Sequence, residues 1–507
     1  MNTFLNQMTK DSNITRTENG GVTRKSTESK VLDMFAVGGA YRTRSDEDVI
    51  LLFKNAFEED RLLAMKCLFY LRDIRGGQGE RRFFRVAFHW LCNKYPKIAE
   101  ANLMNVVEYG RWDDLIYATI NTSVEDAALK IIKHQLALDI QCKTPSLLGK
   151  WMPSINASNK KTKRLGKKLA NFLGMDDREY RKTLSVLRER INVLERLMSA
   201  NRWDEIEFDK IPSKAGLIYR NAFARRNILA KKYEAFAKSK DTKVNADALY
   251  PHDIAHKAFR AQCLALDDPK RLMLQKYWDN LKDFYNGREE NGIAVVDVSG
   301  SMRGIPMEAA VSMGAYIADK AHGPFANHFI TFSAHPELVR FEGVDIVDKF
   351  NRCIRADWGM NTNVQAVFDM LLSTALKKNV KAEDMPTRIY IFSDMEFDDC
   401  VFFDRVPKPF YNSWSRWDVC HTVNSIDEVN SDLENIKREW ARHGYKMPQV
   451  IFWNLNARNN RIPAIGDGFS YVSGFSPSMI DCILSGKDGW DLMVEKLMSK
   501  RYAAVVA

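Results

Sequence analysis

One short stretch constrains the fold of this 507-residue chain more than any other: residues 294–301 read A-V-V-D-V-S-G-S. An apolar run that ends in small polar residues predicts a buried strand followed by a tight loop. The loop would place one carboxylate, Asp297, and two hydroxyls, Ser299 and Ser301, on the same side of the turn. These are oxygen ligands for a hard cation. Taken alone, the same pattern is also typical of a polar turn that caps a helix.

Two later stretches carry further oxygen ligands. Thr362 stands in G-M-N-T-N (359–363), directly before an apolar helical pattern, and Asp394 ends a second apolar run, I-Y-I-F-S-D (389–394). In this order and spacing, the three stretches resemble the metal-ion-dependent adhesion site of von Willebrand factor A (vWA) domains. The alternative is three unrelated polar loops.

The resemblance implies a role for each of the five residues. Ser299, Ser301 and Thr362 would coordinate directly, while Asp297 and Asp394 would hold the waters of the ion or close one position. Such a set is octahedral, all oxygen and low in negative charge, which suits Mg²⁺ or Mn²⁺. Because hydroxyl ligands leave the cation under-neutralised, its open position should favour an Asp or Glu of a partner protein, or a phosphate.

From Gly292 onward, strand patterns alternate with helix patterns. This alternation predicts a mostly parallel, doubly wound (Rossmann-like) sheet with helices on both faces. Ligands of such sheets bind beyond the carboxyl ends of strands, so Asp297 and Asp394 can converge there. We expect strands at residues 293–298, 328–333, 388–393, 449–454 and 469–472, and helices at residues 305–321, 364–375, 426–442, 476–484 and 488–499.

Before Gly292 the periodicity is helical. Apolar residues at three-and-four spacing over residues 46–70 predict two amphipathic helices divided near 58–60. The first thirty residues are rich in Asn, Thr, Ser and charge and have no apolar core. We therefore predict three parts: a flexible tail (1–30), an all-α helical-repeat region (31–286) and a vWA-like α/β domain (287–507).

Positive charge is concentrated in the helical region. Residues 1–290 carry +14 and residues 291–507 carry −4, and residues 141–240 alone carry +14. Aromatic residues lie among these cations, a mixture that suits phosphate contact and base stacking and favours RNA. The alternative is a set of solvated helix faces whose aromatic rings point into the core. The candidate RNA-binding residues are Lys160, Lys161, Lys163, Arg164, Lys167, Lys168, Arg181, Lys182, Arg220, Arg225 and Arg226.

Three motifs in the helical region widen the resemblance. They are L-R-D-I-R-G-G-Q-G-E-R (71–81), Y-G-R-W-D-D-L (109–115) and I-P-S-K (211–214). With the vWA-like half, they resemble an uncharacterised family related to the TROVE-containing Ro autoantigens. This implies HEAT-like helical repeats that hold small noncoding or single-stranded RNA, and R-W-D-D recurs as R-W-D-E at 202–205. The glycine-rich loop is either a connector or a phosphate cradle.

Other features exclude several classes of protein. Eight cysteines stand singly, which disfavours a zinc site or a disulfide framework and favours a reducing, cytoplasmic setting. No run of eighteen apolar residues predicts a membrane span. His252 and His256 are spaced for a shared metal, but Asp253 stands where zincins need Glu, so we expect structural histidines. No P-loop, nucleophile elbow or pair of catalytic carboxylates indicates an enzyme.

Two classes of function stay open. In the first, the protein is a non-enzymatic, Ro-like RNA-binding scaffold whose vWA domain binds Mg²⁺ and recruits a partner through an acidic ligand. In the second, it is a protein-interaction adaptor or assembly factor with a metal-dependent adhesion site and no nucleic acid. Both classes are expected to act away from membranes.

Overall fold

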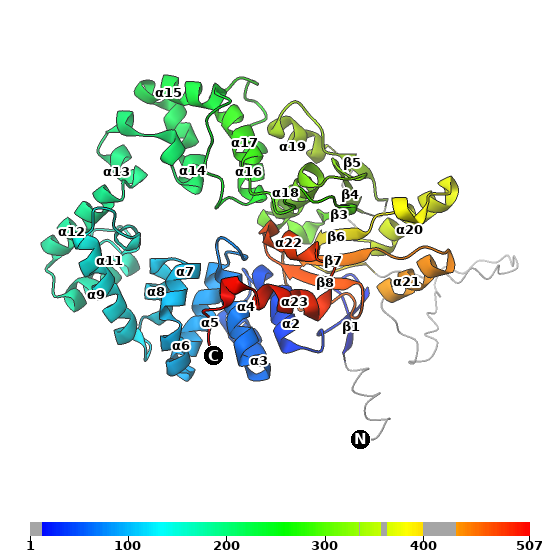
Figure 1. Cartoon of the computed structure of the whole chain (residues 1–507), viewed down its shortest axis with the longest axis horizontal. Coiled ribbons are helices and arrows are strands. Elements are labelled where there is room, and N and C mark those ends of the chain that lie inside the picture. Colours follow the sequence, from blue (N-terminus) through cyan, green and yellow to red (C-terminus); the bar gives the residue numbers. More distant parts are fainter. Residues whose placement is uncertain (1–12, 334, 356–361, 399–431) are drawn as a thin grey trace, which may run out of the picture.

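The computed structural model describes residues 13–333, 335–355, 362–398 and 432–507. A helical region and an α/β region make up the chain, as the sequence predicts. The helices follow an arc that leaves one side of the sheet, passes through α9 to α12, and returns to the sheet through α17 (Figure 1). Within the described residues, no helix combines the length and the apolar character needed to cross a membrane.

Sixteen α-helices of the described residues form the arc. They are α2 (Lys30–Val37), α3 (Asp46–Glu59), α4 (Arg61–Arg72), α5 (Arg81–Lys94), α6 (Pro96–Ala101), α7 (Leu103–Tyr109), α8 (Trp112–Thr119), α9 (Glu125–Gln141), α10 (Leu148–Trp151), α11 (Lys160–Leu173), α12 (Asp177–Arg190), α13 (Leu194–Ser199), α14 (Ser213–Arg225), α15 (Asn227–Lys238), α16 (Pro251–Ala258) and α17 (Pro269–Asp279).

The boundary between α3 and α4 shows how polar residues divide the helical pattern. Ser45 caps α3 by accepting a hydrogen bond from the Asp48 amide, and the Asp48 carboxylate returns a contact to the Ser45 amide. Asp60 ends α3 and caps α4, because its side chain accepts the Leu63 amide at 2.8 Å. The predicted division near residues 58–60 is confirmed.

The α/β region is a six-stranded sheet in the order β5-β4-β3-β6-β7-β8. All neighbours are parallel except the edge strand β5, which pairs antiparallel with β4. Its strands are β3 (Gly292–Asp297), β4 (His328–Phe332), β5 (Leu338–Arg340), β6 (Arg388–Ser393), β7 (Gln449–Asn454) and β8 (Phe469–Ser473). Its helices are α18 (Ile305–Lys320), α19 (Ile346–Ile354), α20 (Val364–Lys378), α21 (Asp432–Arg442), α22 (Ile480–Ile483) and α23 (Gly489–Leu497).

Strand order positions the candidate metal ligands. After β3 the chain builds outward through β4 and β5, and it then crosses to β6 on the other side of β3. Val296 of β3 pairs with Phe392 of β6, so the two strands end at the same level. The loops that begin at Asp297 and Asp394 therefore leave the sheet side by side, at the point where strand order reverses.

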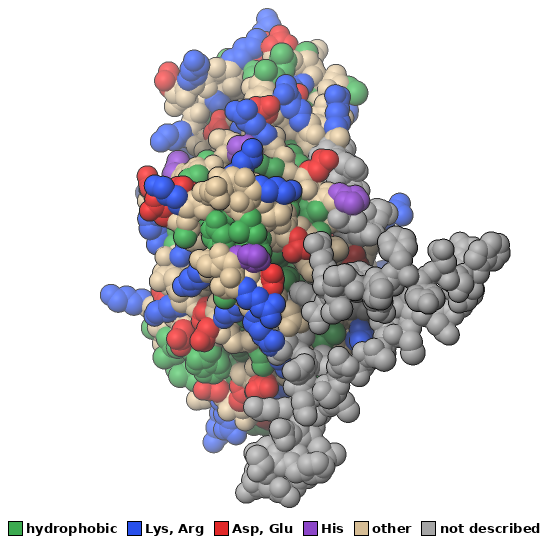
Figure 2. All heavy atoms as spheres, turned by 90° about the vertical axis from the view of Figure 1, so that its right-hand side faces the viewer, with side chains coloured by type: hydrophobic (Ala, Val, Ile, Leu, Met, Phe, Trp, Pro, Cys, Tyr) green, Lys and Arg blue, Asp and Glu red, His purple; other side chains and the backbone are tan. Residues whose placement is uncertain are grey.

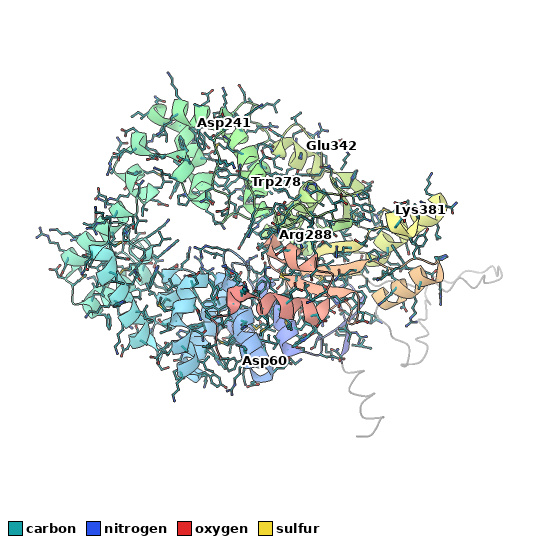
Figure 3. The ribbon with its side chains drawn as sticks, viewed as in Figure 1. Asp60, Asp241, Trp278, Arg288, Glu342 and Lys381 are labelled. Atoms are coloured by element: carbon teal, nitrogen blue, oxygen red, sulfur yellow. The ribbon has the colours of Figure 1, made fainter. Side chains whose placement is uncertain are left out.

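Both ends of the arc are attached to the α/β region. At the start, α2 packs against β7 and β8, and α4 packs against α23. At the end, α16 packs on α18, and α17 packs on α19. Trp278 of α17 lies at this second junction (Figure 3) and donates its indole N–H to Asp319 at 2.9 Å. Arg271 of α17 also pairs with Asp345, with Nη2 and Oδ1 2.9 Å apart.

The glycine-rich loop of the first motif is a connector. The backbone N–H groups of residues 77–80 all donate to carbonyl oxygens of residues 70–73. No N–H of these four residues is left to cradle a phosphate. The Gln78 side-chain carbonyl accepts the Ser476 amide at 3.1 Å, and Ser478 donates to the Gly77 carbonyl. The loop thus joins the start of the arc to the segment after β8.

The prediction of a flexible tail over residues 1–30 is wrong for residues 13–30, whereas residues 1–12 lie outside the described chain. β1 (Ile14–Arg16) and β2 (Val22–Arg24) form an antiparallel hairpin, and α2 begins at Lys30. Arg24 and Ile462 exchange backbone hydrogen bonds of 3.0 Å. Contacts with distant segments hold the hairpin, so its own sequence gives little sign of it.

We expect Arg501→Ala to destabilise the protein by about 2 kcal/mol. Arg501 pairs with the wholly buried carboxylate of Asp73, and removing one partner of a buried pair costs about 3–5 kcal/mol. Arg501 is itself 36% exposed, which places the effect below that range. Urea unfolding followed by tryptophan fluorescence measures it. Arg288→Ala, which breaks an exposed pair with Asp481, is the control and should cost less than about 1 kcal/mol; equal losses would contradict the assignment.

Candidate functional site

Asp297 ends β3 and is wholly buried. Its Oδ1 accepts the Ser299 amide at 2.8 Å, and its Oδ2 accepts the Ser393 hydroxyl at 2.6 Å. These bonds hold the carboxylate across the carboxyl ends of β3 and β6. Among the described salt bridges, none reaches Asp297. A buried carboxylate without a cationic partner is costly, so this position suits a bound cation.

Ser299 and Ser301 lie in the short loop that follows β3. A single 3₁₀ turn (Gly300–Met302) separates the strand from α18. The two hydroxyl oxygens are 3.1 Å apart, and the Ser301 carbonyl accepts the Asn456 side-chain amide at 3.2 Å. The turn therefore brings both hydroxyls together next to Asp297, as the sequence predicts.

Asp394 directly follows β6 and is also wholly buried. Its Oδ1 accepts the Glu396 amide at 3.2 Å, and its Oδ2 lies 3.2 Å from the Arg458 guanidinium. The next residue, Met395, has a φ of 67°, which is costly for a residue with a side chain. Backbone strain of this kind concentrates at functional sites.

The charge of Asp394 acts on Asp297. Burial, followed by the negative charge of Asp394, raises the pKa of Asp297 from 3.8 to about 6. Of the two wholly buried carboxylates, only Asp394 has a described ion pair, and its partner Arg458 is 34% exposed. A divalent cation between them would remove both the repulsion and the uncompensated charge. Four of the five predicted residues therefore fit a Mg²⁺ site.

Thr362 is buried beside the same loops but is engaged elsewhere. Within the described chain, its hydroxyl donates to Asp398 and to the Glu396 carbonyl, both at 3.0 Å, and accepts the Asn19 side-chain amide at 3.1 Å. Its amide also donates to Asp398 at 2.9 Å. The structure thus places Thr362 against the loop after β6, bonded to Asp398 and the Glu396 carbonyl and not to the other four predicted ligands.

Sequence reasoning missed several residues that surround the site. Glu396 and Asp398 follow Asp394 at alternate positions, and this regular acidic spacing was the available signal. Arg458 and Asn459 come from the loop after β7, 64 residues beyond Asp394, and no local pattern marks them. In the described residues, no group of three or more His, Cys, Asp or Glu side chains is arranged to hold a metal. The proposed centre depends instead on hydroxyls beside two carboxylates.

The predicted RNA-binding residues lie on the arc. All are exposed except Arg220, which is 8% exposed and donates to the Leu217 carbonyl. Arg220 is therefore removed from the candidate surface. Six of the others, from Lys160 to Lys168, lie on α11. The described atoms of the α/β side show Lys and Arg interspersed with Asp and Glu (Figure 2).

Four aromatic residues were predicted to stack on bases, and the prediction is wrong for three of them. The four are Tyr180, Tyr219, Phe223 and Tyr233. Tyr180, Phe223 and Tyr233 are at most 1% exposed and belong to the core. For these three residues the alternative holds, in which the aromatic rings point into the core. Tyr219 is partly exposed.

A cavity of about 830 Å³ opens between α8, α10 and α12. Its lining includes the aromatic residues Tyr117 and Trp151 and also Thr162 of α11. It also includes Arg181, one of the predicted RNA-binding residues. The Arg111 guanidinium lies 3.9 Å from the centre of the Trp151 ring. The cavity brings aromatic and cationic side chains together beside the basic helix.

The two histidines of α16 have different neighbours. His252 is buried, and burial lowers its pKa to about 4, while its ring packs against Phe475 with centroids 4.9 Å apart. His256 Nδ1 lies 2.8 Å from Glu308 of α18. These contacts agree with the predicted structural role, which stays a prediction.

Comparison with known proteins finds two family patterns that match this chain. The pattern of a family described as "Domain of unknown function (DUF2828)" matches residues 17–135 and 123–296, more than half of the chain. This chain belongs to the DUF2828 family. A second pattern, "Domain of unknown function (DUF7788)", matches residues 291–503. A protein of Acanthamoeba polyphaga mimivirus described as "Uncharacterized protein L728" is 30% identical over 528 residues, covering 94% of this chain and 85% of the relative.

The two matched segments meet at the candidate metal centre. The DUF2828 segment ends at residue 296, within β3, and the DUF7788 segment begins at residue 291. The DUF2828 segment also begins at residue 17, so it includes Asn19, which contacts Thr362. Residues of both matched segments of this DUF2828 protein therefore lie at the candidate centre.

We expect Asp297→Asn to stabilise the metal-free protein at pH 7.5. The folded pKa of about 6 exceeds the unfolded value, so ionisation of Asp297 destabilises the fold as pH rises through 4 to 6, and the cost is complete above about 6. Two pKa units correspond to roughly 2–3 kcal/mol. Thermal melting in EDTA should show the gain at about pH 7.5 and none near pH 4.

The matched control is Asp345→Asn. Asp345 forms an ion pair with Arg271, so removing the charge of Asp345 should lower the melting temperature at pH 7.5. A fall in stability for both variants at this pH would contradict an uncompensated charge at Asp297.

Proposed function

We propose that this DUF2828 protein is a non-enzymatic, Ro-like RNA-binding scaffold. Its α/β region acts as a vWA-like domain that binds Mg²⁺, or Mn²⁺, and recruits a protein partner through an Asp or Glu side chain. The observation that carries the proposal is the pair of buried carboxylates, Asp297 and Asp394, set beside two hydroxyls at the switch point of the sheet. Such switch points bind ligands in open α/β sheets.

The metal assignment rests on the donor set. Ser299 and Ser301 offer neutral oxygens, and Asp297 and Asp394 offer charge that one guanidinium partly offsets. The Thr362 hydroxyl bonds to Asp398. To coordinate the cation, it would have to exchange this hydrogen bond for a bond to the metal. When bound, the cation would supply an electrophilic position that an acidic side chain can fill. The residues of the chain hold and orient it.

The RNA assignment rests on α11. Its first turn contains Lys160, Lys161 and Lys163 and no acidic residue. The N-terminus of a helix is the positive end of its dipole, so lysines there are repelled and the helix is less stable. A bound anion such as a phosphate would relieve this repulsion. The adjacent cavity adds Trp151 and Tyr117, whose rings can stack on unpaired bases. Phosphate contact and base stacking together suit single-stranded or small noncoding RNA.

The arc suits a scaffold. Its helices pack mainly on their neighbours in sequence, as in HEAT-like arrays, and both ends are attached to one sheet. A closed arrangement holds the basic helices at a fixed distance from the metal centre, so RNA and protein partner can be held at once. A cytoplasmic ribonucleoprotein component matches this design and the single cysteines.

The second candidate is an adaptor or assembly factor that binds protein through the metal centre and no nucleic acid. Two ion pairs favour this candidate: Lys167 pairs with Asp177, and Lys168 pairs with Glu125. Part of the positive charge of α11 is therefore neutralised by acidic residues of the same chain.

RNA affinity should weaken steeply with salt, and the basic turn of α11 should account for part of the slope. The quantity of interest is the slope of the logarithm of the RNA association constant against the logarithm of the salt concentration. We expect this slope to flatten by roughly 1 to 3 units when Lys160, Lys161, Lys163 and Arg164 are changed to Gln, because each phosphate contact contributes about 0.7. Fluorescence anisotropy with a labelled single-stranded RNA measures it. Lys167 and Lys168 stay unchanged, since they form ion pairs.

The control changes four exposed lysines of the α/β region to Gln, namely Lys377, Lys378, Lys381 and Lys487. It should leave the slope unchanged. Absence of RNA binding by the unaltered protein at about 50 mM salt, or equal effects of the two sets, would favour the adaptor.

Mg²⁺ affinity should fall at least about tenfold in Ser299→Ala and in Asp394→Asn, because each removes an oxygen ligand or a group that orients the shell. Isothermal titration calorimetry measures the affinity. Ser312→Ala is the control, since this buried hydroxyl of α18 donates to the Ala309 carbonyl and lies outside the centre. Unchanged affinity in both site variants would rule out the metal assignment.

A further inference from the structure

The turn of the β1–β2 hairpin lies on the candidate metal centre. Thr17 donates its hydroxyl to the Phe397 carbonyl at 2.5 Å, and the Glu18 amide donates to Glu396 Oε2 at 2.6 Å. Asn19 donates to the Glu396 carbonyl at 2.7 Å and to the Thr362 hydroxyl at 3.1 Å. The hairpin thus contacts the loop after β6 and one of the predicted ligands.

The approach is close enough to require glycine. A Cβ at Gly21 would lie 2.7 Å from the Phe397 carbonyl oxygen and 2.8 Å from that of Asp398. Gly20 has a φ of 96° and forms a bridge with Asp398. Two glycines in succession therefore let the turn lie flat on the acidic loop, where any other residue at position 21 would lift it.

Glu18 places a carboxylate at the outer edge of the centre. Its Oε2 lies 2.7 Å from Arg458 Nη1, and the same guanidinium lies 3.2 Å from Asp394 Oδ2. Its Oε1 accepts the Asn459 side-chain amide at 2.7 Å. One guanidinium thus bridges Glu18 and Asp394. Two carboxylates held against one guanidinium leave one negative charge uncompensated, so a cation bound at the centre would favour this arrangement.

We propose that Glu18 is the acidic ligand of the metal centre supplied from within the chain, so that the hairpin occupies the face on which a partner binds. This inference rests on the proposed metal site. A partner carrying Asp or Glu on a turn must displace Glu18, and the free energy of lifting the hairpin is subtracted from its affinity. The glycine turn and the bridge through Arg458 make the hairpin a competitor of the partner.

Hydrogen exchange of the full-length protein tests this assignment. Mg²⁺ should slow amide exchange in a peptide covering residues 13–25 several-fold, because the bound cation holds Glu18 in place. Glu18→Gln should abolish this slowing while calorimetry still shows Mg²⁺ binding. Glu58→Gln, an exposed change on α3, is the control and should behave like the unaltered protein.

The outcomes separate the two assignments. If calorimetry shows no Mg²⁺ binding to the unaltered protein, the metal site itself fails. If Mg²⁺ binds but the exchange of residues 13–25 is unchanged or faster, the metal site stands and Glu18 is not its ligand.

A second variant tests the competition directly. Gly21→Ala should lift the turn by steric contact and leave every charge in place. A labelled synthetic peptide of residues 13–25 should then bind this variant with Mg²⁺ at least about tenfold more tightly than it binds the unaltered protein. The same peptide with Gln at position 18 is the control. Equal binding of the two peptides, or equal binding to both proteins, overturns the proposal.

Discussion

One buried carboxylate, Asp73, ties the start of the helical arc to the segment that follows α23. Asp73 accepts hydrogen bonds from Arg501 and from the Tyr502 hydroxyl at 3.0 Å, and both residues lie near the end of the chain. The preceding residue, Arg72, pairs with the wholly buried Asp114. Two sequence motifs, at residues 71–81 and 109–115, are thus parts of a single ionic network. Charges buried in this way fix a unique arrangement, because each is costly without its partner.

The sequence determines the sheet more completely than its surroundings. The limits of β6 (Arg388–Ser393) and β7 (Gln449–Asn454) follow from apolar runs that are buried on both faces, and they were predicted to the residue. β5 (Leu338–Arg340) was missed, because an edge strand of three partly exposed residues has no such run. The β1–β2 hairpin was missed because its partners, residues 396–398 and Ile462, are more than 370 residues away.

The candidate site shows the same limit. Asp297, Ser299, Ser301 and Asp394 were predictable because each follows a strand whose apolar run is visible in the sequence. Arg458 and Glu18 were not predictable, because charged residues are frequent on loops. Only the fold brings these two side chains together. Burial is the other property that sequence alone conceals. Arg220 lies in a basic segment like its neighbours, but its place on α14 turns it towards Tyr233 and Tyr277.

The arrangement of α18 connects the two halves of the molecule. Its first turn follows the loop that carries Ser299 and Ser301, and Glu308 in that turn contacts His256 of α16. A ligand on the arc and a ligand at the centre can influence each other only if both bias the same element. α18 contacts α16 at the end of the arc and follows the loop of the candidate centre, so it is the element through which the two proposed sites would be coupled. Because the arc closes onto this helix, the two proposed sites would have a common support.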